Sequence, residues 1–150
     1  MTAAPIVKNI NDLTTYRISA EDTVKLTHLT GPSDGSPTSV FFEIWEPLGR
    51  QPDNSHPDSV EIFIVLNGTA RATSDDHTVD LHAGDVLVLP EGSVHHIQNA
   101  SDVDRLYTVT IMANDSGAME KGFESLVMNG TPEPLTDADK LALLPALTSR

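Results

Sequence analysis

The sequence predicts an all-β domain of the sandwich or barrel type. Short apolar runs recur along most of the chain, and clusters of Gly, Pro, Asn, Asp and Ser separate them. About eight or more short strands at this turn spacing are typical of two packed sheets or a closed barrel. The chain has 150 residues, a length that suits one domain whose core is stable without disulfides.

The predicted strands follow one another with a turn or loop between each pair. Residues 24–29 form the first, and the loop 31–37, rich in Gly and Pro, leads to a strand over 39–46. A long loop with three prolines follows. Residues 61–68 read as a buried strand ending in an Asn-Gly turn, which predicts a hairpin into the next strand. The remaining strands are expected over residues 69–74, 77–82, 85–90, 95–99 and 105–112.

The strand over 39–46 carries aromatic side chains on both faces. Because side chains alternate along a strand, Phe41 and Trp45 share one face with Glu43, and Phe42 and Ile44 share the other. One face should fill the interior. We expect the other to pack against a second subunit, which predicts a homodimer.

The pattern in the last part of the chain predicts helices instead of strands. Residues 117–130 favour one or two helical turns, and Thr136, followed by Asp139 at capping-box spacing, predicts a helix start. Pro145 should end or kink that helix, which we expect on the outside of the barrel or at a dimer contact. The organisation expected is therefore a single domain over 1–150, with a β core over about 22–113 and a helical extension over about 117–150.

Composition excludes several function classes. The formal net charge of −13 argues against nucleic acid and anionic membranes as partners. No leader-like segment and no uninterrupted apolar stretch of membrane-spanning length is present, so the expected compartment is the cytoplasm. The chain has no cysteine, so any metal must be held by histidine nitrogen and carboxylate oxygen.

Two stretches place histidines at regular distances from Gly, Pro and acidic residues. The second stretch carries, in order, Gly84, Pro90, Gly92, His95 and Asn99. The first carries His56, Glu61 and Gly68, with Gly49 upstream. These spacings resemble the two motifs of the cupin superfamily, and the second motif is matched at every defining position. The first departs from the pattern once, because Asn54 stands where cupins usually carry the first histidine of His-x-His.

The resemblance implies a cupin-like double-stranded β-helix, or jelly-roll barrel, here with a short C-terminal helix, and a divalent metal inside it. The ligands would be His56, Glu61 and His95. Asn54 lies two residues from His56, on the same face of an extended backbone, and is a candidate fourth ligand; it could instead bond to a bound water or substrate. Two imidazoles and a carboxylate form a facial triad with open positions. This set favours iron or manganese, while nickel, copper and zinc are permitted.

Other residues near the motifs have expected roles of a structural kind. His96 should point away from His95, toward the surface or an interface. Asn99 should satisfy backbone groups near the turn at Pro90 and Gly92. Asp53 or Asp58 could orient a site histidine, although solvated loop aspartates are commoner. His77 and His82 should be solvated, and His28 is expected to be a satisfied structural histidine.

Three functions are consistent with the predicted cupin-like domain and its candidate metal ligands. The leading one is a metal-dependent enzyme acting on a small organic substrate, a dioxygenase-type oxidoreductase first, with lyase and isomerase reactions left open; Glu61 would double as general base. The alternative is a non-catalytic module that binds or senses a small ligand, in which His56 and His95 are structural if the metal has been lost. A helper subunit with the barrel as a scaffold is the third.

Overall fold

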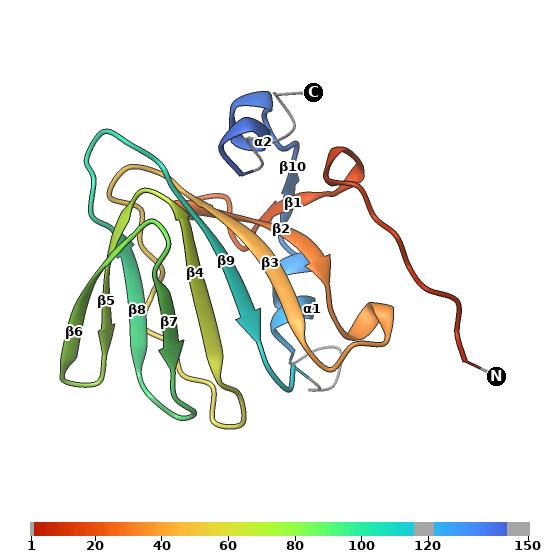
Figure 1. Cartoon of the computed structure of the whole chain (residues 1–150), viewed down its shortest axis with the longest axis horizontal. Coiled ribbons are helices and arrows are strands. Elements are labelled where there is room, and N and C mark those ends of the chain that lie inside the picture. The colour runs from red at the N-terminus through yellow and green to blue at the C-terminus, as the bar shows by residue number, and fades with distance from the viewer. Residues whose placement is uncertain (1, 116–121, 144–150) are drawn as a thin grey trace.

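Two antiparallel sheets pack face to face in the computed structural model, which describes residues 2–115 and 122–143 (Figure 1). The seven-stranded sheet has the order β10-β1-β2-β3-β9-β4-β7, and the three-stranded sheet has the order β6-β5-β8. The all-β jelly-roll prediction is confirmed. The strands are β1 (Thr15–Arg17), β2 (Val24–Thr30), β3 (Ser39–Trp45), β4 (Glu61–Asn67), β5 (Thr69–Ser74), β6 (His77–His82), β7 (Val86–Leu89), β8 (His95–Asn99), β9 (Leu106–Met112) and β10 (Thr131–Glu133). Two 3₁₀ turns (Ile10–Asp12 and Pro32–Asp34) and two α-helices, α1 (Phe123–Met128) and α2 (Asp137–Leu143), complete the described elements.

The space between the sheets is filled mainly by aliphatic side chains and a few aromatic rings. Phe41 and Trp45 of β3 are fully buried there, together with Phe63, Leu106 and Ile97 from other strands. The alternation predicted for β3 is confirmed, since Glu43 is buried between the two aromatic residues. Burying each large apolar side chain contributes roughly 1.5–3 kcal/mol, so this layer stabilises the sandwich.

The other face of β3 corrects one expectation. Ile44 and Phe42 lie in a second apolar cluster, formed with Leu135, Leu143 and the 3₁₀ turn Ile10–Asp12 of the same chain. Part of the face that was expected to meet a second subunit is therefore covered by the chain's own ends. The sequence pattern marked this face as one to be buried, but it could not say by what.

A buried ion pair holds α2 on this outer face. Asp139 is fully buried, with its carboxylate 2.6 Å from Lys25 Nζ, and it also accepts hydrogen bonds from Arg105 and Tyr107. The Asp139 backbone N–H donates to Thr136 Oγ1, so the predicted helix cap is confirmed. The Asp139 side chain turns into the protein and does not complete the capping box. Pro145 lies outside the described residues.

The Asn67–Gly68 turn is not the predicted hairpin. β4 pairs with β7 and β9, whereas β5 pairs with β6 and β8, so these two residues carry the chain from one sheet to the other. Gly68 has φ +102°, and a Cβ there would lie 3.0 Å from the Arg105 carbonyl oxygen. The hairpin is formed one strand later, by β5 and β6, where Asp75 takes φ +51°.

The two shortest strands of the large sheet were missed in the sequence. β1 pairs with β2 on one side and with β10 on the other. Each has three residues, too few for alternation to distinguish them from loop. Over 117–130 the described helix is α1, and residues 117–121 lie outside the described ranges. None of the helices in residues 2–115 and 122–143 is long and apolar enough to cross a membrane.

Candidate metal centre

Three of the predicted ligands come together between the sheets although 39 positions separate the first from the last. His56 lies in the loop before β4, Glu61 begins β4, and His95 begins β8. Their nearest nitrogen and oxygen atoms all lie within 4.8 Å of one another. His56 Nε2 is 3.1 Å and His95 Nε2 is 3.7 Å from Glu61 Oε2. The spacing can accommodate a divalent ion bound by two imidazoles and a carboxylate.

Several polar atoms of the cluster have no hydrogen-bond partner among the described residues. They are Glu61 Oε2, His95 Nε2 and Asn54 Oδ1, and all three are buried. The His56 and Glu61 side chains are close but do not have hydrogen-bond geometry. Buried polar atoms without partners are costly, roughly 1–3 kcal/mol each, and metal ligation would satisfy them. The donor set therefore fits the ion that the sequence predicts.

Asn54 faces this cluster. Its backbone exchanges two hydrogen bonds of 2.9 Å with His95, as in an antiparallel pair, and side chains of such a pair share a face. Asn54 Nδ2 donates to the Pro52 carbonyl oxygen at 3.2 Å, which leaves Oδ1 unpaired. Oδ1 is therefore available as a fourth oxygen ligand or as an acceptor for a bound water.

Ser93 sets the orientation of the His95 ring, and the sequence reading missed it. Ser93 Oγ donates to the Pro90 carbonyl oxygen at 3.1 Å and lies 3.2 Å from His95 Nδ1. Because the hydroxyl hydrogen goes to Pro90, the serine oxygen accepts from His95 Nδ1–H. The neutral ring then carries its lone pair on Nε2, the atom that faces Glu61. A hydroxyl residue two positions before His95, on the same face of the chain, was the available signal.

Hydrogen bonds between the two motifs fix the site. The Gly92 N–H donates to the His56 carbonyl oxygen at 2.9 Å, and Ser55 Oγ donates to the Gly92 carbonyl oxygen at 3.1 Å. Gly92 has φ +76°, which glycine adopts without strain. The turn between β7 and β8 therefore positions His95 and, through the loop, His56.

The electrostatics favour a charged Glu61. Burial raises the pKa of Glu61, but the His56 and His95 rings beside its carboxylate outweigh burial and hold that pKa below its usual range. An ionised carboxylate is the form that binds a metal ion.

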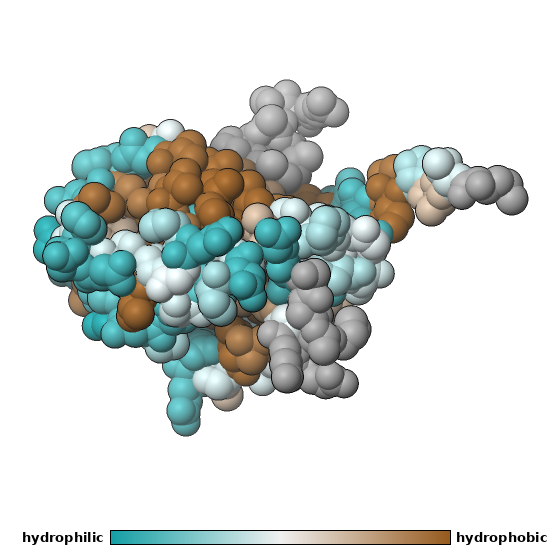
Figure 2. Space-filling model, turned by 90° about the horizontal axis from the view of Figure 1, so that it is seen from below, coloured by the Kyte–Doolittle hydropathy of each residue, from teal (hydrophilic) through white to brown (hydrophobic). Residues whose placement is uncertain are grey.

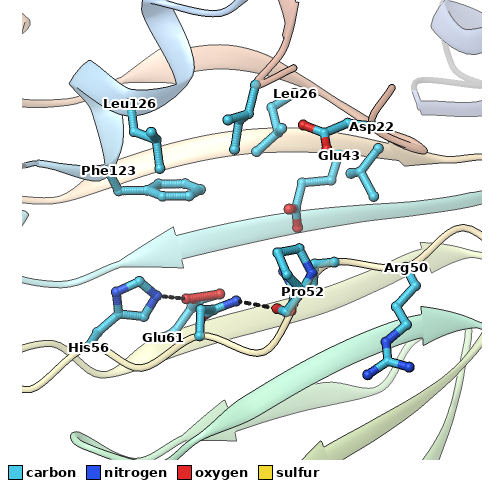
Figure 3. Close-up of a pocket in the computed structure, with 13 residues that line it drawn as sticks. Asp22, Leu26, Glu43, Arg50, Pro52, His56, Glu61, Phe123 and Leu126 are labelled. Atoms are coloured by element: carbon cyan, nitrogen blue, oxygen red, sulfur yellow. Dashed lines mark hydrogen bonds and ion pairs between the residues drawn. The ribbon is translucent and has the colours of Figure 1, made fainter. Parts of the chain in front are cut away.

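A cavity of about 210 Å³ opens beside the cluster. His56 and Glu61 lie on one side with Leu26, Phe123 and Leu126 across from them, and Asn54, Ile18 and Val24 also line the cavity. Figure 3 shows Phe123 and Leu126 of α1 across the cavity from His56 and Glu61. Glu43 of β3 also lines the cavity; the sequence placed it on one face with Phe41 and Trp45 without assigning it a role.

The remaining histidines and aspartates lie away from the centre. His96 points outward and its Nδ1 is 2.7 Å from Asp53 Oδ1, so Asp53 orients His96 rather than a histidine of the site, contrary to one alternative above. Asp58 makes no side-chain hydrogen bond to a histidine in the described part of the chain. His77 and His82 are exposed, as expected. His28 is buried and paired with Glu124 at 2.6 Å, also as expected.

Asn99 corrects another expectation. It does not serve the turn at Pro90 and Gly92, because it lies at the opposite end of β8. Its Nδ2 donates to the Glu46 and Asp104 carbonyl oxygens at 3.0 and 2.8 Å, and its Oδ1 accepts from the Ser101 N–H at 3.0 Å. Asn99 thus ties the chain after β3 to the loop between β8 and β9.

Known proteins share this fold and part of this sequence. The family described as "Cupin domain" matches residues 41–112. Germin-like protein 8-2 of Oryza sativa subsp. japonica is 41% identical over 56 residues, which are 33% of this chain and 25% of that protein. Germin-like protein 8-14 of the same plant is 30% identical over 95 residues, or 59% of this chain and 44% of that protein. The match thus spans less than half the length of these curated relatives.

Solved structures agree on the fold. A predicted oxalate decarboxylase from Thermotoga maritima has a TM-score of 0.65 at 21% identity and covers 73% of this chain and 99% of that one. A Cupin 2 conserved barrel domain protein from Salinispora arenicola has a TM-score of 0.57 at 24% identity, covering 77% of this chain and 91% of that one. The two-sheet architecture, the motif spacing and the family match agree. Residues 41–112 therefore form a cupin domain, and the strands that flank them extend the same fold.

Proposed function

We propose that this protein is a metal-dependent enzyme that acts on a small organic molecule in the cavity beside His56, Glu61 and His95. One observation carries the proposal: three ligand atoms from distant segments lie within 4.8 Å of one another at a cavity wall. The residues would hold one divalent transition metal, iron or manganese first. When bound, the ion supplies Lewis-acid polarisation of a ligand oxygen or activation of dioxygen. A dioxygenase-type oxidation is the reaction we propose first.

The chain's own residues have defined tasks in this scheme. His95 offers Nε2 as a neutral ligand because Ser93 accepts its Nδ1–H. Glu61 is ionised, so it can hold the ion and can accept a proton from a ligand hydroxyl beside it. Asn54 Oδ1 adds an oxygen that can ligate the ion or accept a hydrogen bond.

The cavity wall indicates the substrate's chemistry. One end must offer oxygen atoms to the metal centre, whereas the apolar side chains opposite favour a hydrocarbon body. Oxalate, which the name of one structural neighbour contains, is a small dianion without apolar surface, so this wall would contribute little to its binding. We therefore infer a larger molecule that joins adjacent oxygen atoms to an apolar ring or chain.

Metal analysis of protein made without a histidine tag tests the proposal. We expect near one equivalent of a single transition metal in the wild type and loss of that metal in His56→Ala and His95→Ala. His82→Ala is the matched control, because His82 is an exposed histidine outside the cluster. Equal metal content in all three variants would refute the ligand assignment. Turnover of chelating diols by the loaded protein separates the enzyme from a non-catalytic binding module, which would bind them unchanged.

An uncovered apolar face supports a homodimer as a further part of the proposal. Ile62 and Ile64 of β4 pair across strands with Val88 and Val86 of β7, and with Ile111 and Val109 of β9. Val86 and Val88 are each 59% exposed. Figure 2 shows the resulting hydrophobic patch on one side of the molecule. Analytical ultracentrifugation of the wild type should show a dimer, and Val88→Glu should shift it to a monomer. A monomeric wild type would refute the proposed homodimer.

A further inference from the structure

Glu43 is a second buried carboxyl group in the cavity. It is 2% exposed and lies on β3, between the fully buried Phe41 and Trp45. Figure 3 shows its carboxyl group pointing from β3 into the cavity, toward the side where Glu61 lies. The metal ligands proposed above do not include it.

One oxygen of Glu43 is fixed by a directional chain of hydrogen bonds. Trp45 Nε1 donates to Thr108 Oγ1 at 3.0 Å, and Thr108 Oγ1 lies 3.1 Å from Glu43 Oε1. An indole N–H only donates, so Thr108 accepts from Trp45 and gives its own hydrogen to Oε1. Oε1 is therefore an acceptor, and any proton on the Glu43 carboxyl group sits on Oε2.

The surroundings favour that proton. Burial raises the pKa of Glu43 well above its usual range, the Glu61 carboxylate raises it further, and the Thr108 hydrogen bond only partly opposes them. A metal ion bound to Glu61 would weaken the effect of the Glu61 charge on the pKa of Glu43, but burial, the largest cause of the raised pKa, would remain. Within the described part of the chain, the Glu43 carboxyl group has a single hydrogen-bond donor, at Oε1, and buried apolar neighbours. These contacts would offset little of the free-energy cost of burying its negative charge.

We propose that Glu43 binds the ligand of the metal centre, with its Oε2–H donating a hydrogen bond to an oxygen of that ligand. This inference rests on the proposed function. Oε2 has no partner among the hydrogen bonds of the described residues, so a ligand oxygen would satisfy it. A site built to donate a hydrogen bond discriminates strongly against molecules that cannot accept it. Glu43 would thus select, within the apolar cavity, molecules with an acceptor placed opposite β3.

The probe for this proposal is 4-nitrocatechol, a coloured chelator with adjacent oxygen atoms, an apolar ring and an acceptor at its far end. Its dissociation constant is measured by absorption on Mn²⁺-loaded protein. Glu43→Met, which keeps the length but removes the donor, should weaken binding by about threefold to tenfold. Glu43→Gln should stay within about twofold, because the amide oxygen can accept from Thr108 while its NH₂ donates to the probe. Glu21→Gln, the same substitution at an exposed carboxyl group that does not line the cavity, is the control and should have no effect.

Two results would overturn the proposal. Unchanged affinity in Glu43→Met means that Glu43 does not touch the ligand. Tighter binding in Glu43→Gln means that Glu43 is ionised and repels the catecholate. Metal content is measured on the same samples, so loss of the metal centre is distinguished from failure of Glu43 alone.

Infrared difference spectroscopy gives a readout that does not depend on a folded Glu43→Met variant. The wild type minus Glu43→Gln spectrum should contain the carbonyl band of a protonated carboxylic acid. Adding 4-nitrocatechol should shift this band to lower frequency as the hydrogen bond forms. The absence of the band, or a band that the probe leaves in place, would contradict the proposal.

Discussion

Replacing Ser93 with alanine tests how the site holds its metal ligands. Ser93 Oγ is the group that accepts from His95 Nδ1 at 3.2 Å while donating to Pro90 at 3.1 Å. Alanine removes this acceptor without touching His95 Nε2, His56 or Glu61. The ring is then free to take the other tautomer, in which Nε2 carries the hydrogen and cannot ligate.

The expected loss of metal affinity follows from the hydrogen bond that Ser93→Ala removes. Partners that orient a ligating histidine typically contribute 10- to 100-fold to metal affinity, or about 1.4–2.8 kcal/mol. The Ser93–His95 distance is at the long end for a hydrogen bond, so the lower half of that range, about tenfold to thirtyfold, is expected. The fold should tolerate Ser93→Ala, because the one other hydrogen bond lost among the described residues is that to the Pro90 carbonyl oxygen, which contributes about 1 kcal/mol to the free energy of unfolding.

Competition with a chelator measures the affinity, and a denaturant titration checks the fold. Ser36→Ala is the matched control: Ser36 Oγ also donates to a backbone carbonyl oxygen, that of Thr38, but Ser36 does not line the cavity. Metal affinity in Ser36→Ala should stay within about twofold of wild type. If Ser93→Ala also stays within that limit, or if both serine variants lose affinity equally, then Ser93 does not set the tautomer and the reasoning is wrong.

Three further outcomes are expected. Asp139→Ala should lower the free energy of unfolding by about 3–5 kcal/mol, because Lys25 is left buried and unpaired. Burial raises the pKa of Asp139, but its hydrogen-bond donors, Lys25 first, outweigh burial and lower that pKa. The ionised carboxylate therefore contributes its full stabilisation above the ordinary aspartate pKa, and this contribution is lost as the pH falls through the lower pKa of the folded state. Urea titrations at neutral and acidic pH should show this pH dependence in the wild type and not in Asp139→Ala. Gly68→Ala should cost about 2 kcal/mol or more, because a positive φ is combined with a close backbone contact, whereas Gly35→Ala, with no atom within 4 Å, should cost about 1 kcal/mol. Asn54→His should tighten metal binding in chelator competition, and an unchanged affinity would place the Asn54 side chain outside the coordination sphere.

The sequence predicts those parts of the site that short-range rules govern. Two-residue alternation places Phe41, Glu43 and Trp45 on one face of β3, and the structure shows that this face is the inward one. The motif spacing brings His56, Glu61 and His95 together, and the structure places their ligand atoms within 4.8 Å. Whether they bind a metal stays a prediction that the metal analysis above tests.

What the sequence does not predict depends on contacts between distant segments. The role proposed for Glu43 follows from its environment, which burial, the Glu61 carboxylate and the Thr108 hydroxyl determine. The Asn67–Gly68 turn has the composition of a hairpin, yet it joins two sheets because β4 pairs with β9 rather than with β5. Turn chemistry specifies a local backbone conformation, and strand pairing is decided elsewhere in the chain.

The two walls of the cavity come from different parts of the chain. Asn54, His56, Glu61 and Glu43 lie within the matched residues 41–112, whereas the apolar wall, from Ile18, Val24 and Leu26 to α1, lies outside that range. In the proposed scheme, the polar groups that would bind the metal and a ligand oxygen are thus encoded in one stretch of the chain, and the apolar contacts to the ligand in others. Mutations in the flanking segments can change which molecule is accepted while the reactive groups stay the same. If the proposed function holds, grafting those segments between cupin domains should change which molecule the cavity binds while the motif residues stay the same.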